Sequence, residues 1–185
     1  MTMRQCIFLT VCSIFLILVA GCTDTPTEIQ PPQTLSTLPV PASGAQDIPL
    51  LQLFGDTTGK GIPGGTIDTI TFTIGLTDIY KSVDIEQLTI VYADAIRTET
   101  LRPVEGFHGD PQKGFWSITS VENEVGDPNN RLDNEERFVI TINPKAPLVP
   151  RQILTIDIKP QNGDSLTIRR VSPPSIFEDN ILLPP

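Results

Sequence analysis

Hydrophobic and polar residues alternate strictly along residues 69–76. Ile70, Phe72, Ile74 and Leu76 fall on one side of this stretch, and three threonines and a glycine fall on the other. A period of two is the pattern of a β-strand that is buried on one face. The alternation returns at residues 88–92. The whole stretch 64–92 therefore predicts two strands of one domain.

The same alternation marks several further strands, at residues 50–54, 96–101, 116–121, 138–142, 154–158 and 166–168. Asn162-Gly163 separates the last two, and this dipeptide is a strong hairpin signal. Arg102-Pro103 predicts the end of one strand. The glycine-rich stretch 55–65 and residues 107–111 are typical of turns. Residues 181–183 predict an extended segment that covers a sheet edge.

Seven or eight strands without a helical window predict an all-β fold. We expect an antiparallel immunoglobulin-like β-sandwich, with a Greek-key barrel as the related alternative. The composition agrees, since 13 glycines and 18 prolines suit short strands joined by many turns. The predicted buried residues are Ile70, Phe72, Ile74, Leu88, Ile90, Trp116, Ile118, Phe138, Ile140, Leu154, Ile156 and Ile168.

The first 21 residues have the pattern of a lipoprotein signal peptide. Arg4 precedes an apolar run from Ile7 to Ala20, which is shorter than a membrane span and predicts a short helix. The run ends in Val19-Ala20-Gly21-Cys22, which resembles a lipobox, so we expect a lipid on the thiol of Cys22. An ordinary secretory signal or a short uncleaved anchor is the alternative.

Residues 22–47 predict a disordered linker that begins with the lipidated cysteine. Residues 23–47 hold five prolines and seven hydroxyl residues without periodicity. Such a composition buries too little surface to fold and favours extended polyproline II. The folded domain is then expected to cover residues 48–185. Cys6 and Cys12 would leave with the signal, so the mature chain would contain no internal disulfide.

The net charge of −9 argues against two classes of partner. An acidic surface repels both nucleic acid and anionic lipid, so the predicted contact with the membrane is the lipid on Cys22. Enzymatic chemistry also lacks a basis. His108 is the single histidine, no G-x-S-x-G motif carries a nucleophile, and the glycines around Lys60 lack the P-loop order. We therefore predict a protein that is not an enzyme.

One loop has the composition of a cation site. The sequence from Gly126 to Glu136 reads GDPNNRLDNEE, and Asp127, Asn129, Asp133, Glu135 and Glu136 are oxygen ligands of the kind that Ca²⁺ prefers. The spacing departs from the EF-hand pattern, and Arg131 weakens the field that a cation would feel. The loop predicts either a Ca²⁺ site or a solvated acidic loop that protects a sheet edge. No other cofactor is expected.

Four segments of the domain resemble the outer globular domain of archaellins, the filament subunits of the archaeal flagellum. They are the glycine-rich turn and strand at 61–76, SVDIEQLTIVY at 82–92, DPNNRLDNEERFVITI at 127–142, and LTIDIKPQNGDSLTIRRVSPP at 154–174. The resemblance spans residues 50–183. Archaellins also have a long N-terminal helix that forms the filament core, and this chain has no counterpart of that helix.

The resemblance implies a structural or interaction role, at the archaellum and in motility or elsewhere on the cell surface. Archaellum subunits and other surface proteins are the partners that it implies. Together with Cys22, it leads us to expect a protein that is lipid-anchored on the extracellular face of the cytoplasmic membrane. The alternative is a surface lipoprotein that binds a solute or carbohydrate. Its binding platform would be Tyr80, Phe107, Phe115 and Trp116, so it requires these aromatic side chains to be exposed.

Overall fold

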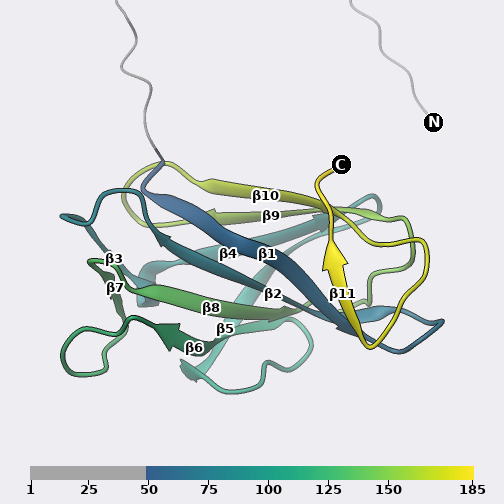
Figure 1. The fold of residues 1–185 in the computed structure, drawn as a ribbon, viewed down its shortest axis with the longest axis horizontal. Coiled ribbons are helices and arrows are strands. Elements are labelled where there is room, and N and C mark those ends of the chain that lie inside the picture. The colour runs from purple at the N-terminus through teal and green to yellow at the C-terminus, as the bar shows by residue number, and fades with distance from the viewer. Residues whose placement is uncertain (1–48) are drawn as a thin grey trace, which may run out of the picture. The chain divides into compact units, whose positions relative to one another are not determined.

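The computed structural model describes residues 49–185, which form strands and one short 3-10 helix (Figure 1). The predicted signal, N-terminal helix, lipidated Cys22 and linker lie outside the described residues. The strands are β1 (Leu51–Gly61), β2 (Ile67–Leu76), β3 (Ser82–Asp84), β4 (Thr89–Asp94), β5 (Thr98–His108), β6 (Phe115–Glu122), β7 (Arg131–Asp133), β8 (Arg137–Asn143), β9 (Ile153–Lys159), β10 (Leu166–Val171) and β11 (Asp179–Leu182), with the helix η1 (Ile85–Gln87) between β3 and β4.

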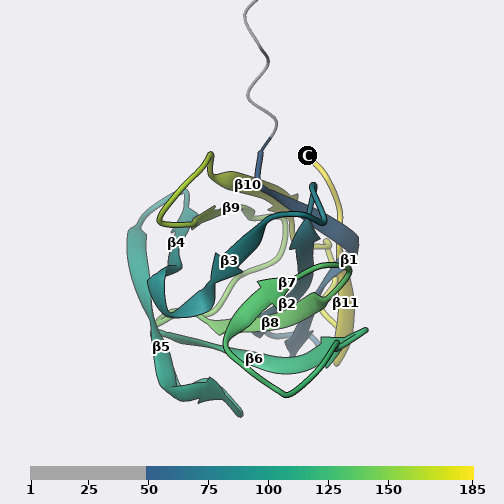
Figure 2. The same ribbon diagram turned by 90° about the vertical axis from the view of Figure 1, so that its left-hand side faces the viewer.

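Nine strands form one curled sheet that nearly closes on itself (Figure 2). Their order is β10-β9-β4-β5-β6-β8-β2-β1-β11, and β3 and β7 pair separately. The two edges of the sheet meet where Val171, at the end of β10, bridges Leu183, just after β11. The two N–H···O distances there are 2.8 and 3.2 Å. The predicted covering of an edge by residues 181–183 is confirmed, since β11 pairs with β1.

The all-β class is confirmed, but the sheet is mixed. The neighbours β5 and β6 run parallel, with Arg102 opposite Phe115, whereas the sequence predicted only antiparallel pairs. The segment 109–114 carries the chain back along β5, and the Arg102 N–H donates to the carbonyl of Gly114 at 3.1 Å. Gly109 and Gly114 have positive φ angles, a conformation that glycine adopts without strain. Sequence alternation identifies strands but not their direction, so this pair could not be foreseen.

The predicted core is confirmed in full. All twelve residues that the alternation placed inside the domain are buried, together with Ile67, Leu76, Tyr92 and others. They belong to one hydrophobic cluster. Burial of one large aliphatic or aromatic side chain stabilises a fold by about 1.5–3 kcal/mol. This core is therefore what holds the sheet in its curled form.

Part of one predicted turn and one predicted strand end lie within strands. Residues 55–61 belong to β1, and only 62–66 form a turn. A Cβ at Gly59 would lie 2.7 Å from a methyl carbon of Ile67, so β1 needs glycine there because β2 packs so closely. Likewise β5 continues through Pro103 to His108. Pro103 lies beyond the last residue of β5 that pairs with β4, so its missing N–H costs no hydrogen bond on that side.

Candidate functional site

The predicted cation loop lies between β6 and β8 and contains β7. The short strand β7 pairs with β3, which ties the loop to the segment that precedes β4. Figure 1 shows this small sheet at the end of the domain where the described chain begins. We call this end, which contains Leu50 and residues 77–88, 122–136 and 160–165, the entry end.

Glu136 is the best-fixed acidic side chain of the loop. It is only 3% exposed, and its two carboxylate oxygens accept hydrogen bonds from the N–H groups of Val125 and Asp133, at 3.0 and 3.1 Å. Its own N–H donates to the carbonyl of Asp133 at 3.0 Å. Hydrogen bonds from N–H groups to a carboxylate are strong where water is excluded. Glu136 therefore acts as a clamp that joins the two ends of the loop.

Asn129 and Asp133 also interact within the loop. The side-chain oxygen of Asn129 accepts from the N–H of Arg131 at 2.7 Å, and its amide group donates to the carbonyl of Asp127. Asp133 lies 3.9 Å from the guanidinium of Arg131, which also donates to the hydroxyl of Ser82 on β3. These contacts fix the shape of the turn, as is usual for asparagine and aspartate side chains in loops.

Asp127 and Glu135 are exposed and belong to no ion pair among residues 49–185. In the same part of the chain, no group of three or more His, Cys, Asp or Glu side chains is arranged to hold a metal ion. The structure thus brings the five predicted ligands into one loop and uses Glu136 and Asn129 for backbone contacts. The Ca²⁺ site stays a prediction, and the solvated acidic loop is the arrangement that these contacts favour.

The aromatic residues do not form an exposed platform. Trp116 is 1% exposed and packs in the core against Phe107, with the ring centroids 5.9 Å apart. Phe115 lies beneath the guanidinium of Arg102, at 4.6 Å from the ring centroid. Tyr80 is 91% exposed but follows β2 in another loop. The carbohydrate or solute platform therefore loses its central residue.

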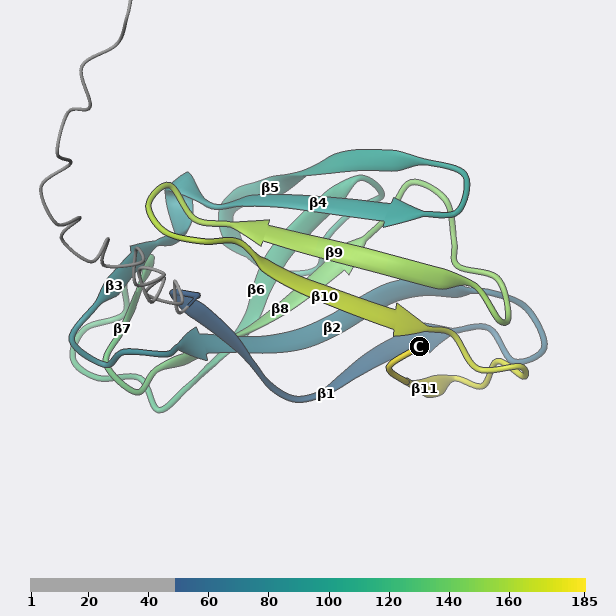
Figure 3. The same cartoon turned by 90° about the horizontal axis from the view of Figure 1, so that it is seen from above.

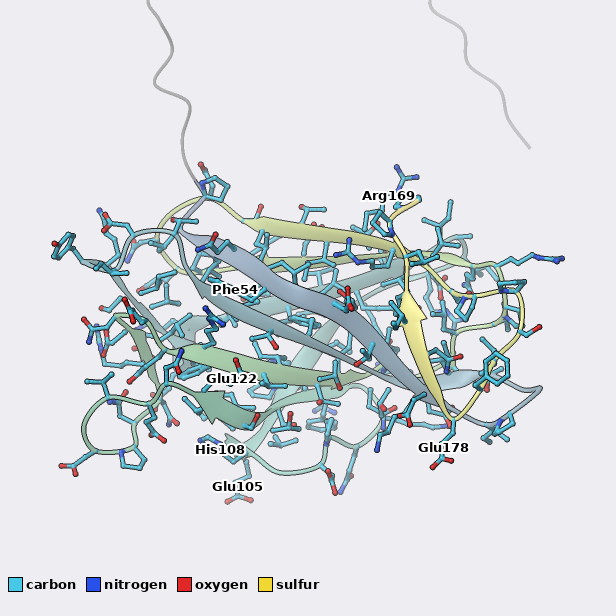
Figure 4. All side chains as sticks on the ribbon, viewed as in Figure 1. Phe54, Glu105, His108, Glu122, Arg169 and Glu178 are labelled. Atoms are coloured by element: carbon cyan, nitrogen blue, oxygen red, sulfur yellow. The ribbon has the colours of Figure 1, made fainter. Side chains whose placement is uncertain are left out.

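His108 ends β5 on the surface and has no arrangement of partners for catalysis. It lines a shallow hollow with Ser120, Glu124 and Asn129, and Figure 4 shows it on the same side of the molecule as Glu105 and Glu122. No hydrogen bond joins its ring to a hydroxyl or carboxylate among the described residues, whereas a catalytic base needs both partners. Within 49–185, no helix is long and apolar enough to cross a membrane.

Sequence reasoning missed a second buried carboxylate, Asp94 at the end of β4. Its side chain is fully buried and lies 2.9 Å from the guanidinium of Arg97. One oxygen accepts from the N–H groups of Ile96 and Arg97, at 2.8 and 3.0 Å. Burial raises the pKa of the Tyr92 phenol above its ordinary value, and the negative charge of Asp94 is the second largest cause. The D-A-I-R sequence was the available signal, because aspartate often closes a turn onto the amides that follow it.

Comparisons with known proteins place the fold. The fold of the described residues, a curled, mixed sheet of nine strands with the separate pair β3-β7, is similar to that of two archaeal flagellar proteins. The crystal structure of archaeal flagellin FlaB1 from Methanocaldococcus jannaschii matches with a TM-score of 0.56 and 12% identity, over 72% of this chain and 96% of that chain. The archaeal flagellum of Methanospirillum hungatei strain JF1 matches with a TM-score of 0.51 and 19% identity, over 72% and 70%.

The periplasmic stator protein complex FlaF and FlaG of Sulfolobus acidocaldarius matches less well, with a TM-score of 0.47 and 16% identity over 69% of this chain and 93% of that chain. No family model matches the sequence, and no curated protein does. The archaellin-like fold that the sequence led us to expect is supported, and at these identities the likeness concerns the fold alone.

Proposed function

We propose that this protein is a non-enzymatic surface protein that acts by contact with other proteins, at the archaellum or elsewhere on the cell surface. A lipid on Cys22 would hold it on the extracellular face of the cytoplasmic membrane, and residues 23–47 would serve as its tether. The observation that carries the proposal is the fold shared with the two archaeal flagellar proteins.

Two features of the chain support the lipid-anchored form of this role. The apolar run from Ile7 to Ala20 is shorter than a membrane span and leads into the lipobox-like Val19-Ala20-Gly21-Cys22. The described domain also contains a complete hydrophobic core of its own, between Leu51 and Leu182. A domain of this kind is suited to stand outside the cell at the end of a flexible tether.

The alternative of a solute- or carbohydrate-binding lipoprotein has less support. It required an aromatic platform, and Trp116 is buried among core residues. A hollow of about 740 Å³ at the entry end is lined by Leu50, Thr77, Ile79, Lys81 and Asn162 among others. None of these residues is an aromatic that could stack on a sugar ring. We therefore favour protein contact.

The proposal is tested in a deletion strain complemented with the wild-type gene or with Cys22→Ser. We expect deletion to impair archaellum assembly, motility or another property of the cell surface. Cys22→Ser should release the protein from the membrane fraction and fail to restore the lost property. Mass spectrometry of the purified wild-type protein should find Cys22 as the modified N-terminus. A deletion strain without any motility or surface phenotype would contradict the proposed role.

A further inference from the structure

The end of the sheet opposite the entry end carries most of the exposed hydrophobic side chains of residues 49–185. We call it the far end; it comprises residues 62–66, 94–97, 144–153, 169–178 and Leu183, and Figure 3 shows the turns that meet there. Exposed side chains on these segments are Ile62, Ile96, Val149, Ile153, Phe177 and Leu183. Exposed apolar residues that gather in one place mark an interaction surface more often than a solvated one.

Hydrogen bonds join these segments into one surface. The N–H of Gly64 donates to the carbonyl of Ile176, and that of Arg151 donates to the carbonyl of Pro173. The hydroxyl of Ser172 donates to the carbonyl of Val149 at 2.6 Å. Val171 pairs with both Ile153 and Leu183. The apolar side chains therefore belong to one continuous end of the domain rather than to separate loops.

Arginines lie among these apolar side chains. Arg151 and Arg169 are exposed, and neither forms an ion pair with any residue of the described domain. Arg169, labelled in Figure 4, lines an open recess of about 510 Å³ with Ala93 and Ile153. Arginine together with exposed aromatic and aliphatic residues is the composition of protein interfaces. The far end thus fits a partner that combines carboxylates with apolar side chains.

The entry end of the same chain has that composition. Glu124, Asp127 and Glu135 project from the acidic loop, and none of them forms an ion pair within residues 49–185. Val125, just before this loop, is 57% exposed, and Tyr80 is exposed in a neighbouring part of the same end. The two ends of the domain are therefore complementary in charge, and each also offers apolar side chains.

We propose that the far end of one copy docks on the acidic loop of a second copy, so that domains associate head to tail. Opposite charges steer the two ends together and select their orientation, while the apolar side chains supply buried area. Such a contact joins different surfaces and leaves one free end on each side, so it can extend into a row. The inference deepens the proposed contact role, because it names the partner surface as a second copy.

The association is tested by sedimentation velocity on residues 45–185, which contain the whole core and form a separate compact unit. At low salt we expect the sedimentation coefficient of the wild type to rise with protein concentration. Raising the ionic strength should weaken this rise, because salt screens exposed charges. Persistent monomers at low salt, or association that salt leaves unchanged, would overturn the head-to-tail contact.

Two double variants separate the two surfaces. Arg169→Ser with Phe177→Ser removes one positive charge and one exposed aromatic side chain from the far end. Glu124→Gln with Asp127→Asn removes two negative charges at the acidic loop. Each should lower the association constant by about tenfold or more, whereas Asp56→Asn, at an exposed position in the middle of β1, should not. An equimolar mixture of the two double variants has one intact end of each kind and should form a one-to-one dimer that grows no further.

Two further outcomes would each contradict the head-to-tail contact. If the acidic-loop variant still associates while the far-end variant does not, two far ends contact each other and the head-to-tail arrangement is wrong. If the wild type is monomeric but the far-end variant fails to complement the deletion strain, the far end binds another protein. That result would overturn the second-copy proposal and leave the proposed surface role intact, because the role is decided by the deletion phenotype alone.

Discussion

At each end of the sheet a buried carboxylate fixes the shape of one loop, and the two carboxylates differ in the groups that bind them. At the far end, Asp94 accepts two backbone N–H groups and also lies 2.9 Å from the guanidinium of Arg97. At the entry end, Glu136 accepts two backbone N–H groups and belongs to no ion pair among residues 49–185.

The difference teaches how the two ends acquire opposite characters. A buried carboxylate needs hydrogen-bond donors, and a cation is one way among several to supply them. The amides of Val125 and Asp133 suffice for Glu136, so no arginine pairs with it. Arg131 in the same loop pairs with Asp133, and the exposed Glu124, Asp127 and Glu135 belong to no ion pair within residues 49–185. At the far end, the ion pair with Arg97 balances the charge of Asp94. Arg151 and Arg169 form no ion pair there, so they add positive charge to that surface.

The largest effect should come from Glu136→Ala. The substitution leaves the N–H groups of Val125 and Asp133 without their acceptors and empties a buried site, so we expect a loss of about 2–3 kcal/mol in the free energy of unfolding. Urea unfolding of residues 45–185 measures it. The neighbouring Glu135→Ala is the control, since Glu135 is exposed, and it should change stability by about 0.5 kcal/mol or less. Equal losses in both variants would show that the clamp contributes nothing.

A smaller loss is expected for Asp94→Asn. The amide oxygen can still accept from Ile96 and Arg97, so the loss is confined to the other oxygen, which pairs with the guanidinium and accepts a long hydrogen bond of 3.5 Å from the Tyr92 hydroxyl. Arg97 is about one-third exposed, 35% for its side chain, and solvent compensates part of this loss. We expect about 1–2 kcal/mol by the same unfolding measurement. Asp164→Asn, in the exposed hairpin, is the control. A loss greater than that of Glu136→Ala would reverse the ranking of the two carboxylates.

The sequence predicted the strands and core well because both depend on local alternation. The twelve predicted buried positions, from Ile70 to Ile168, followed from period-two alternation, and the Asn162-Gly163 hairpin joins β9 and β10 as expected. The failures arose where distant contacts decide. The sequence assigns Gly59 to a turn, and only its close approach to Ile67 in the folded protein explains a glycine within β1. The parallel pairing of β5 and β6 has no signature in the sequence of either strand.

The candidate site was predictable in composition but not in geometry. The sequence identified the acidic loop, yet nothing in GDPNNRLDNEE distinguishes the inward-facing Glu136 from the exposed Glu135 beside it. The two differ because β8 begins at Arg137 and its pairing with β2 fixes which neighbour faces the interior. Likewise, the far-end surface joins segments that lie far apart in the sequence, such as those of Ile62 and Phe177, and only the fold brings them together.

Tyr92 makes the stability of the domain depend on pH in the alkaline range. Burial, with the nearby Asp94 as a second cause, raises the pKa of the folded phenol above its ordinary value. The neutral phenol therefore stabilises the fold fully below about pH 10, and this contribution is lost as the pH rises above that value, by about 1 kcal/mol per pH unit. Tyr92→Phe should remove this loss and change stability little at neutral pH. Tyr80→Phe, at an exposed position, should retain the alkaline loss of the wild type.

The smallest expected effect concerns Ca²⁺ at the acidic loop. Both oxygens of Glu136 already bind backbone N–H groups, and Arg131 lies beside Asp133, so a cation would have to displace existing contacts. We therefore expect the Tm of residues 45–185 to be the same in millimolar Ca²⁺ and in EDTA. A bound ion would raise Tm in proportion to the logarithm of its concentration. A rise of this form in the wild type that Asp127→Asn abolishes would establish the Ca²⁺ site instead, and the entry end would then neutralise its carboxylates with a metal ion where the far end uses arginine.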